Sequence, residues 1–349
     1  MIFSNKKGLT FDDVTLVPDH STVMSRSAPS TLTKVGIFSL KIPIIAAPMN
    51  TVCEFNMSRA LEKLGASSVI HRYMSIEDQV NQAKCHAQLF IDSKFEYPFF
   101  AIGANGDFFE RAKALHEIGI NKFCIDVANG DSVYSISAIK KIAQSIPDAI
   151  IMAGNVCTGE GFARLADAGA DLIRVGVGSG AMCKTRIVTG HGVPQLTALI
   201  LAEEARRRFP RVGIISDGGI RSSGDIVKAL AIADFVMLGS LLAGTDEAPG
   251  DIIKENGEQY KLYAGMASED GRALGNWFDE RKTSFVPEGE STKLKYKGSV
   301  TKIIEDLVAG LKVGMSYAGA LDLNQLKLHA QFMEVTSAGA IEGTPHGKY

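Results

Sequence analysis

The chain has 349 residues, of which 46% are hydrophobic and 22% charged, the composition of an ordinary globular protein that buries a core. Its formal net charge of -2 excludes a general attraction to nucleic acid or to an acidic membrane surface, so we expect neither partner and a local site for any anionic ligand. The first residues lack a signal peptide and no apolar run reaches the length of a membrane span, so we expect a cytoplasmic protein.

Short β-branched or apolar runs recur along the chain, and each is followed by a turn of small residues and then by a stretch of helical periodicity. Eight such runs occur in order, at residues 42–50, 66–73, 99–106, 122–130, 149–156, 171–180, 212–220 and 234–240. Amphipathic stretches between or after them include residues 107–119, 159–170 and 223–232. The sequence therefore predicts eight strands that alternate with helices.

Strands that alternate with helices imply right-handed crossovers and a parallel sheet. Eight units fit a closed (β/α)8 TIM barrel, an α/β fold in which functional groups gather at the C-terminal ends of the strands. The alternative is a doubly wound open sheet, but the dinucleotide signature G-x-G-x-x-G is missing near the first strand. No linker or repeat divides the chain, so we treat residues 1–349 as a single domain.

Two segments lack this alternation. Residues 268–300 are polar, rich in charge and glycine and without apolar periodicity, which is long for a connection. We interpret about 268–296 as a mobile flap, either a functional lid or partly disordered. The C-terminal tail, about 336–349, is expected to be irregular as well.

Glycine turns in the last two units predict a phosphate site. Residues 216–220 (SDGGI) and 238–244 (LGSLLAG) each follow a predicted strand and begin a helix, where backbone N–H groups bind phosphate without a lysine. These are late strands, where barrels commonly hold a phosphate. Asp217 adds a carboxylate suited to the two hydroxyls of a ribose. The alternative is that these glycines only make tight turns.

Cys183 is the candidate nucleophile. The chain has five widely spaced cysteines without a C-x-x-C pair, which argues against a disulfide framework or a structural zinc site. A lone cysteine is more often a small buried hydrophobic residue. Cys183, however, lies in a glycine-rich turn after a strand, beside Lys184 and Arg186, and neighbouring cations favour a reactive thiolate.

Ordered motifs from residue 9 to about residue 340 resemble those of the inosine monophosphate (IMP) dehydrogenase / guanosine monophosphate (GMP) reductase family. They are GLTFDDVTLVP, AAPMNTVCE, IHRYMSIEDQ, DVANG, AGNVCTGE, GVGSGAMCKTR, GVPQLTA, SDGGI, VMLGSLLAGTDEAPG and GMAS. The resemblance implies a (β/α)8 barrel, usually a homotetramer, whose loop cysteine attacks C2 of a purine nucleotide. It makes Cys183 the nucleophile and a covalent thioimidate the intermediate.

The resemblance also implies the binding residues. Substrate ribose and phosphate would be held by Asp217, Gly218, Gly219, Gly239 and Ser240, and the base would be lined by Gly265, Met266 and Ala267. The nicotinamide riboside of the cofactor would contact Asp126, Ala128 and Asn129. A monovalent cation, potassium or another, would bind the carbonyls of Gly178, Gly180 and Cys183, completed by a segment near Glu342 from a neighbouring chain.

The flap favours the reductase branch, which deaminates GMP to IMP with NADPH. The dehydrogenase branch, which oxidises IMP to XMP with NAD, carries an adjacent Arg-Tyr pair in its flap as base, and residues 264–295 contain no tyrosine. The short flap, DVANG and the absence of a regulatory insert also favour the reductase. Thr185 and Glu288 match a pair that could pass a proton to departing ammonia. We predict a GMP reductase without flavin, with an IMP dehydrogenase lacking the regulatory domain as the alternative.

Several features favour the dehydrogenase or depart from both branches. The segment GSLLAGTDEAPG and the tail AQFMEVTSAGAIEGTPHG look more like the dehydrogenase. Arg72 stands where both branches usually have lysine, and Asn50 where they usually have aspartate. A nucleotide-binding member without this chemistry is a third reading, but such a protein would tolerate loss of Cys183 and Thr185, and both are present.

Overall fold

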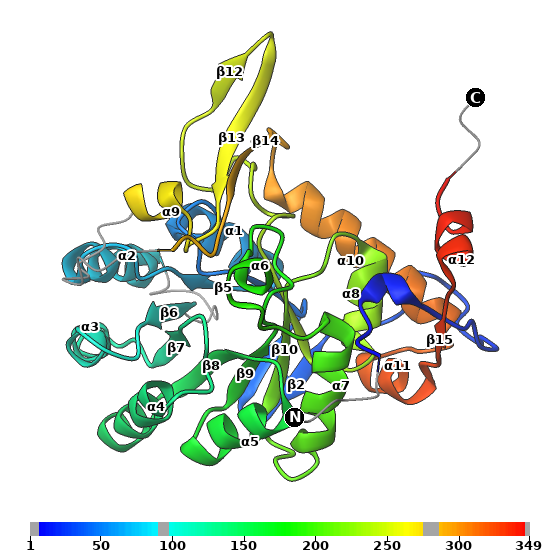
Figure 1. The fold of residues 1–349 in the computed structure, drawn as a ribbon, viewed down its shortest axis with the longest axis horizontal. Helices are drawn as coiled ribbons and strands as arrows, with labels where there is room; N and C mark the ends of the chain where they lie inside the picture. Colours follow the sequence, from blue (N-terminus) through cyan, green and yellow to red (C-terminus); the bar gives the residue numbers. More distant parts are fainter. Residues whose placement is uncertain (1–6, 90–97, 275–285, 346–349) are drawn as a thin grey trace.

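The computed structural model describes residues 7–89, 98–274 and 286–345. At its centre is a closed barrel of eight parallel strands in the order β10-β11-β4-β5-β6-β7-β8-β9, covered by helices (Figure 1). The strands are β4 (Ile44–Ala46), β5 (Ser67–Ile70), β6 (Phe99–Ile102), β7 (Lys122–Asp126), β8 (Ile150–Val156), β9 (Leu172–Val175), β10 (Gly213–Asp217) and β11 (Phe235–Leu238). Each lies within one of the eight predicted runs. The last strand pairs with the first, so the barrel is confirmed and the open sheet is excluded.

Alternate residues of each strand face two separate apolar layers. On β4, Ile45 packs inside the barrel, while Ile44 and Ala46 pack outward against the helices. Both layers are buried, which explains why the strands are continuous apolar runs without polar alternation. The (β/α)8 architecture therefore follows from these runs and from the helices between them.

In the described part of the chain, eight helices surround the barrel, and all three predicted amphipathic stretches are among them. They are α1 (Phe55–Leu64), α2 (Ile76–Leu89), α3 (Phe108–His116), α4 (Val133–Ser145), α5 (Gly159–Ala168), α7 (Gln195–Arg206), α8 (Ser223–Leu230) and α10 (Val300–Tyr317). Their ends follow local chemistry: the Thr158 side chain caps the start of α5, and Gly169 ends it in the left-handed conformation.

A hairpin closes the N-terminal end of the barrel. It consists of β2 (Thr33–Val35) and β3 (Phe38–Leu40), and it places Phe38 edge-on against Phe99 and Phe235, the first residues of two barrel strands. Both ring centroids lie 5.3 Å from that of Phe38. Aromatic side chains therefore pack at this end, and the C-terminal ends of the strands, where a (β/α)8 barrel gathers its functional groups, lie at the opposite one.

A small antiparallel sheet stands at that open end (Figure 1). It contains β12 (Ile253–Glu255), β13 (Glu258–Ala264) and β14 (Ser291–Lys295), and the short helix α9 (Glu269–Ala273) follows β13. The predicted flap is thus more regular than expected at both edges, because β14 pairs with β13 along its whole length. Its centre, 275–285, lies outside the described residues.

The two ends of the chain meet at one side of the molecule. The short helix η1 (Phe11–Asp13) leads into β1 (Val14–Leu16), which pairs antiparallel with β15 (Phe332–Glu334) after α11 (Leu323–His329). Part of the tail expected to be irregular forms α12 (Ser337–Glu342), because Thr336 caps its first turn. Among the described residues, no helix is long and apolar enough to cross a membrane.

Candidate active site

The predicted nucleophile lies on the loop between β9 and the short helix α6 (Thr185–Thr189). The Cys183 thiol is exposed and donates a hydrogen bond to Thr185 Oγ1 at 3.1 Å. The Thr185 hydroxyl in turn donates to Glu288 Oε2 at 2.9 Å. The structure therefore brings all three predicted catalytic residues into one chain of hydrogen bonds, although Glu288 is 105 positions from Cys183 in the 349-residue sequence.

Antiparallel pairing between the cysteine loop and the end of the flap holds this arrangement. The Lys184 amide donates to the Glu288 carbonyl at 2.7 Å, and the Glu290 amide donates to the Met182 carbonyl at 3.0 Å, on either side of a bridge between Cys183 and Gly289. An ion pair between Lys184 Nζ and Glu290 Oε1, 2.5 Å apart, spans the same two segments. The position of Glu288 therefore depends on backbone pairing rather than on its own side chain.

The DGG turn after β10 lies directly against the cysteine loop. Gly218 and Gly219 have φ values of +95° and +78°, a region that glycine adopts without strain. A Cβ on Gly218 would lie 2.5 Å from Ser179 Oγ and 3.0 Å from the Gly180 amide nitrogen. A side chain there would push the loop outward, so the close contact between these two predicted elements requires glycine.

The turn after β11 contains Gly239 and Ser240 and has two neighbours that sequence reasoning missed. A Cβ on Gly239 would lie 3.1 Å from the hydroxyl of Tyr263. Tyr263 is 3% exposed, and burial, with a smaller effect from Asp217, raises its pKa, so it remains a hydroxyl donor. Lys297 Nζ donates to the Ser240 carbonyl at 2.6 Å. The only sequence signal for Tyr263 is its place three residues before Met266.

The predicted base-binding segment lies beside the cysteine loop. The Gly265 amide donates to the Glu290 carbonyl at 2.8 Å, and a Cβ on Gly265 would lie 3.1 Å from the Met182 Cβ. Met266 Sδ accepts from the Asn50 amide at 3.4 Å, and Asn50 Nδ2 donates to the Gly271 carbonyl at 2.9 Å. Asn50 therefore positions this segment. Ala267, half-buried, follows Met266 toward the start of α9.

The predicted nicotinamide residues follow β7. Asp126 is buried at the end of that strand, whereas Ala128 and Asn129 are exposed on the following turn. The Tyr73 hydroxyl donates to Asp126 Oδ2 at 3.4 Å, and the Arg72 guanidinium lies 5.0 Å from the centroid of the Tyr73 ring. Arg72 is thus connected to the Asp126 carboxylate through an aromatic ring.

Arg174 on β9 is the most highly connected residue that sequence reasoning missed. It donates from Nη1 to Asp126 Oδ1 at 2.6 Å and from Nη2 to Asp217 Oδ2 at 2.9 Å. Burial acts to lower its pKa, but Asp217 and Asp126 outweigh it and raise the pKa well above the usual value. A single charged residue inside the apolar stretch 172–175 was the signal that could have found it.

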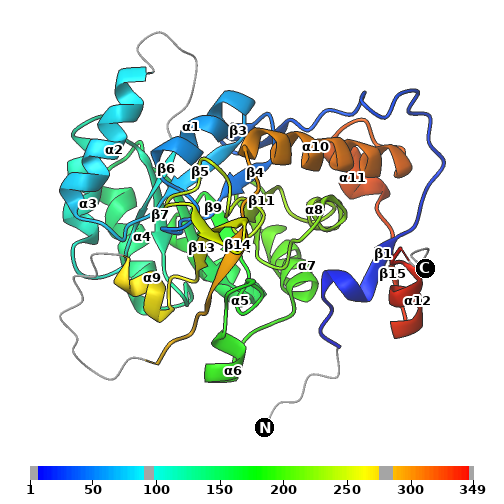
Figure 2. The same ribbon diagram turned by 90° about the horizontal axis from the view of Figure 1, so that it is seen from above.

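Backbone carbonyls are the ligands available for the predicted cation. They belong to Gly178, Gly180 and Cys183, and carbonyl oxygens suit an alkali cation better than zinc or copper. The Gly180 carbonyl also accepts the Cys183 amide at 3.0 Å. The helix α12, which holds Glu342, lies apart from α6 in both views (Figures 1 and 2).

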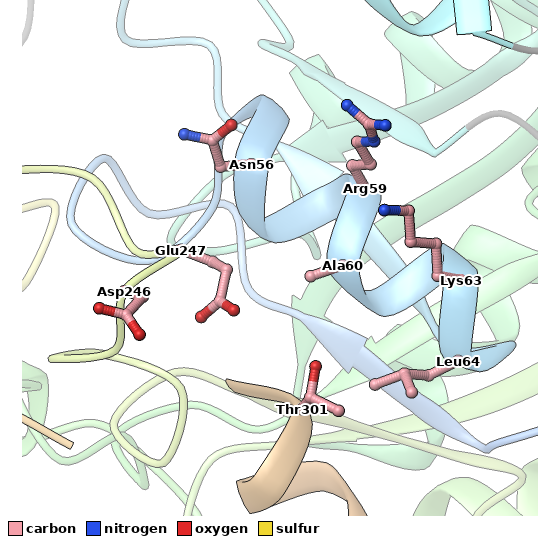
Figure 3. A pocket seen from close by; sticks show the side chains of 8 residues that line it. All are labelled: Asn56, Arg59, Ala60, Lys63, Leu64, Asp246, Glu247 and Thr301. Atoms are coloured by element: carbon pink, nitrogen blue, oxygen red, sulfur yellow. The ribbon is translucent and has the colours of Figure 1, made fainter. Parts of the chain in front are cut away.

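A separate pocket of about 610 Å³ lies between α1, the loop after β11 and the start of α10 (Figure 3). It is lined by Asn56, Arg59, Ala60, Lys63, Leu64, Asp246, Glu247 and Thr301. Glu247 there accepts the Val300 amide at 2.8 Å and so caps α10. None of the predicted catalytic or binding residues lines this pocket.

Comparison with known proteins agrees with the fold. A family model for the IMP dehydrogenase / GMP reductase domain matches residues 8–346. The inosine-5'-monophosphate dehydrogenase of Bacillus subtilis is 32% identical, with 98% of this chain and 96% of that protein covered, and that of Cryptosporidium parvum is 36% identical, with 97% and 95% covered. A Cys-to-Ala variant of GMP reductase from Trypanosoma brucei, in complex with guanosine 5'-monophosphate, superimposes with a TM-score of 0.92 at 29% identity over 99% of both chains.

The alignment lengths show whether lack of the regulatory insert distinguishes a reductase from a dehydrogenase. The alignment with the Bacillus protein spans 470 positions, more than the 349 residues of this chain, so that relative has residues with no counterpart here. The alignment with the Cryptosporidium protein spans only 385 positions, and that protein is named a dehydrogenase too. Lack of the insert therefore does not separate the two activities. The chain belongs to the IMP dehydrogenase / GMP reductase family, whose members are oxidoreductases acting on purine nucleotides.

Proposed function

We propose that this protein is a GMP reductase that converts GMP to IMP and ammonia with NADPH, through a thioimidate on Cys183. The observation that carries the proposal is the hydrogen-bond chain from Cys183 through Thr185 to Glu288. It is a path for protons at the nucleophile, in a flap that has no tyrosine to complete a water-activating Arg-Tyr pair.

The first step removes the amino group of GMP. The Cys183 thiol passes its proton through the Thr185 hydroxyl toward Glu288, as the direction of the hydrogen bonds allows, and the resulting thiolate attacks C2. The same pair returns a proton to the amino group, which leaves as ammonia and gives the thioimidate. The C2–S bond breaks when C2 has accepted a hydride, which releases IMP and the Cys183 thiolate.

The binding residues in this proposal are those that the resemblance to the family implies. Gly218, Gly219, Gly239 and Ser240 hold the ribose phosphate, Asp217 holds the ribose hydroxyls, and Gly265, Met266 and Ala267 line the base. Asp126, Ala128 and Asn129 contact the nicotinamide riboside, and NADPH when bound supplies a hydride. The donor set fits this cofactor, because Asp126 is a carboxylate next to an exposed turn that a riboside could reach.

A monovalent-cation site and a homotetramer are also part of the proposed function. The carbonyls of Gly178, Gly180 and Cys183 bind potassium or another monovalent cation, and Glu342 of a neighbouring chain completes that site in a homotetramer. Replacement of potassium by a large organic cation in the buffer is expected to lower kcat, measured by the absorbance of NADPH. Unchanged kcat would contradict the cation site.

IMP dehydrogenase is the second candidate, favoured by the names of the relatives at 32% and 36% identity. Absorbance at 340 nm separates the two in potassium chloride, with GMP plus NADPH in one reaction and IMP plus NAD in the other. Loss of absorbance in the first alone, abolished by Cys183→Ala, supports the reductase. A gain in the second alone overturns it and makes Arg272 and Arg281 the residues to test as base, of which Arg281 lies outside the described residues.

A further inference from the structure

Arg174 lies in one row of residues across three neighbouring barrel strands. Asp126 on β7 pairs with Gly154 on β8, and Gly154 pairs with Arg174 on β9. A Cβ on Gly154 would lie 2.6 Å from the Arg174 Cβ, so the missing side chain opens the space between the carboxylate and the guanidinium. Arg174 can therefore reach across β8 in one direction and to Asp217, at the end of β10, in the other.

The guanidinium uses separate nitrogens for the two carboxylates. Nη1 donates to Asp126 Oδ1 at 2.6 Å, while Nε and Nη2 donate to Asp217 Oδ2 at 3.1 and 2.9 Å. Arginine alone offers this rigid fork, since the ammonium of lysine is a point charge. At 6% exposure the group has little contact with water, so its charge is balanced by these two carboxylates.

The contacts also decide which oxygen of Asp217 stays available. Oδ2 accepts from Arg174 and also from Asn155 Nδ2, at 2.8 Å. Within the described part of the chain, no hydrogen-bond donor contacts Asp217 Oδ1. The network therefore contacts Asp217 through Oδ2 and leaves the other oxygen for a ligand hydroxyl.

We infer that Arg174 is a positioning residue that couples the purine nucleotide site to the nicotinamide site. The inference rests on the proposed function, which assigns Asp217 to the nucleotide and Asp126 to the dinucleotide. One guanidinium orients both carboxylates, so a ligand that orders one of them orders the other before the second ligand arrives. Coupling of this kind is reciprocal: each ligand strengthens binding of the other by the same factor.

Equilibrium binding to the Cys183→Ala protein measures the coupling, because no covalent adduct forms. Calorimetric titration gives the Kd of GMP with and without saturating NADPH, and the Kd of NADPH with and without GMP; IMP with NAD is titrated in parallel. We expect each ligand to tighten the other about fivefold or more, within the usual range of coupling. When Arg174→Gln is combined with Cys183→Ala, the factor by which each ligand tightens the other is expected to fall close to one.

Arg164→Gln is the matched control. Arg164 also makes a two-nitrogen contact with an aspartate, donating to Asp131 at 2.7 and 2.6 Å, but this pair is at the surface and outside the network. The coupling factor is expected to be the same with and without this change. A factor of one in the protein with Arg174 intact, or an unchanged factor after Arg174→Gln, overturns the inference.

A second variant decides the question if Arg174→Gln does not fold. Asp126→Asn is expected to weaken binding of GMP alone about threefold or more, although Asp126 is assigned to the other ligand, because Arg174 then has one negatively charged partner instead of two. Unchanged GMP affinity in Asp126→Asn overturns the inference. If the wild-type protein does not turn over GMP with NADPH but the coupling is present, only the proposed reductase fails; if no purine nucleotide binds the Cys183→Ala protein, both fail.

Discussion

Glu288 is the residue whose carboxylate would take up the proton in the proposed reaction. It accepts the Thr185 hydroxyl at 2.9 Å, so a glutamine at this position can keep the hydrogen bond but cannot take up a proton. We expect Glu288→Gln to lower kcat about 10²- to 10⁴-fold, the range for loss of general acid–base catalysis, with the KM for GMP nearly unchanged. Steady-state kinetics at 340 nm measures both constants.

Glu290→Gln is the control for that substitution. Glu290 lies two residues further along the same segment and its carboxylate, which is exposed, pairs with Lys184. Exposed ion pairs contribute little, so kcat is expected to stay close to the wild-type value. A Glu288→Gln protein as active as Glu290→Gln would show that the hydrogen-bond chain is not the proton path.

Gly218 tests the contact between the DGG turn and the cysteine loop. Its φ of +95° strains any residue with a Cβ, and that Cβ would lie 3.0 Å from a backbone nitrogen of the loop. We expect Gly218→Ala to destabilise the fold by about 1 to 3 kcal/mol and to raise the KM for the nucleotide. Thermal unfolding and steady-state kinetics provide the two measurements.

Gly224→Ala is the matched glycine variant. Gly224 lies in α8, where an added Cβ would have its nearest contact at 3.6 Å and the backbone is helical. Alanine there is expected to stabilise the helix by about 0.5 to 1 kcal/mol and to leave the KM unchanged. Equal KM values in the two variants would mean that the DGG turn can move without affecting nucleotide binding.

At the scale of elements, the pairing between residues 182–184 and 288–290 determines whether the site is assembled. The Glu290 amide donates to the Met182 carbonyl at 3.0 Å, and proline has no amide hydrogen to make this bond. We expect Glu290→Pro to lower kcat at least about 100-fold because Glu288 loses its register with Thr185, a displacement costly for catalysis. Thermal unfolding should change little, since the barrel does not depend on this segment.

Glu290→Gln again separates the backbone from the side chain, because it retains the amide and removes only the exposed ion pair. Its kcat should stay close to the wild-type value and should therefore exceed that of Glu290→Pro by nearly the full loss expected for the proline variant. If both variants lose activity equally, the Lys184–Glu290 ion pair and not the strand pairing holds Glu288 in place.

At the scale of the whole molecule, the aromatic cluster around Phe38 and the candidate active site lie at opposite ends of the barrel. Phe38 is 2% exposed and packs on two aromatic rings at the N-terminal end, away from the cysteine loop. We expect Phe38→Ala to lower the free energy of unfolding by about 3 to 5 kcal/mol, the usual result of truncating a buried phenylalanine. The kcat of the folded fraction should be unchanged below the Tm.

Ile37→Ala provides the comparison, because Ile37 is next in the chain and 71% exposed. It is expected to change the unfolding free energy by less than about 0.5 kcal/mol. Denaturant unfolding compares the two proteins. A kcat of folded Phe38→Ala below the wild-type value would show that the two ends of the barrel are not independent.

The amino-acid sequence by itself determined the barrel and predicted which residues form the candidate site. Each barrel strand is buried on both faces, so it must be an apolar run, and the run that begins at Ile44 is as visible in the sequence as in the structure. Cys183, Gly218 and Gly219 were predicted for a similar reason. Each lies in the loop that follows the C-terminal end of a barrel strand, where a (β/α)8 barrel places its ligands.

Only the tertiary structure decided what these residues contact. The hydrogen bond of Glu288 with Thr185, and the ion pairs of Arg174 with Asp126 and Asp217, join segments far apart in the chain. No local pattern records such contacts, because they depend on strand register and on the return of the flap. For the same reason the order at the edges of the flap was not predicted: the polar residues of β14 show no periodicity, and they are ordered by their pairing with β13.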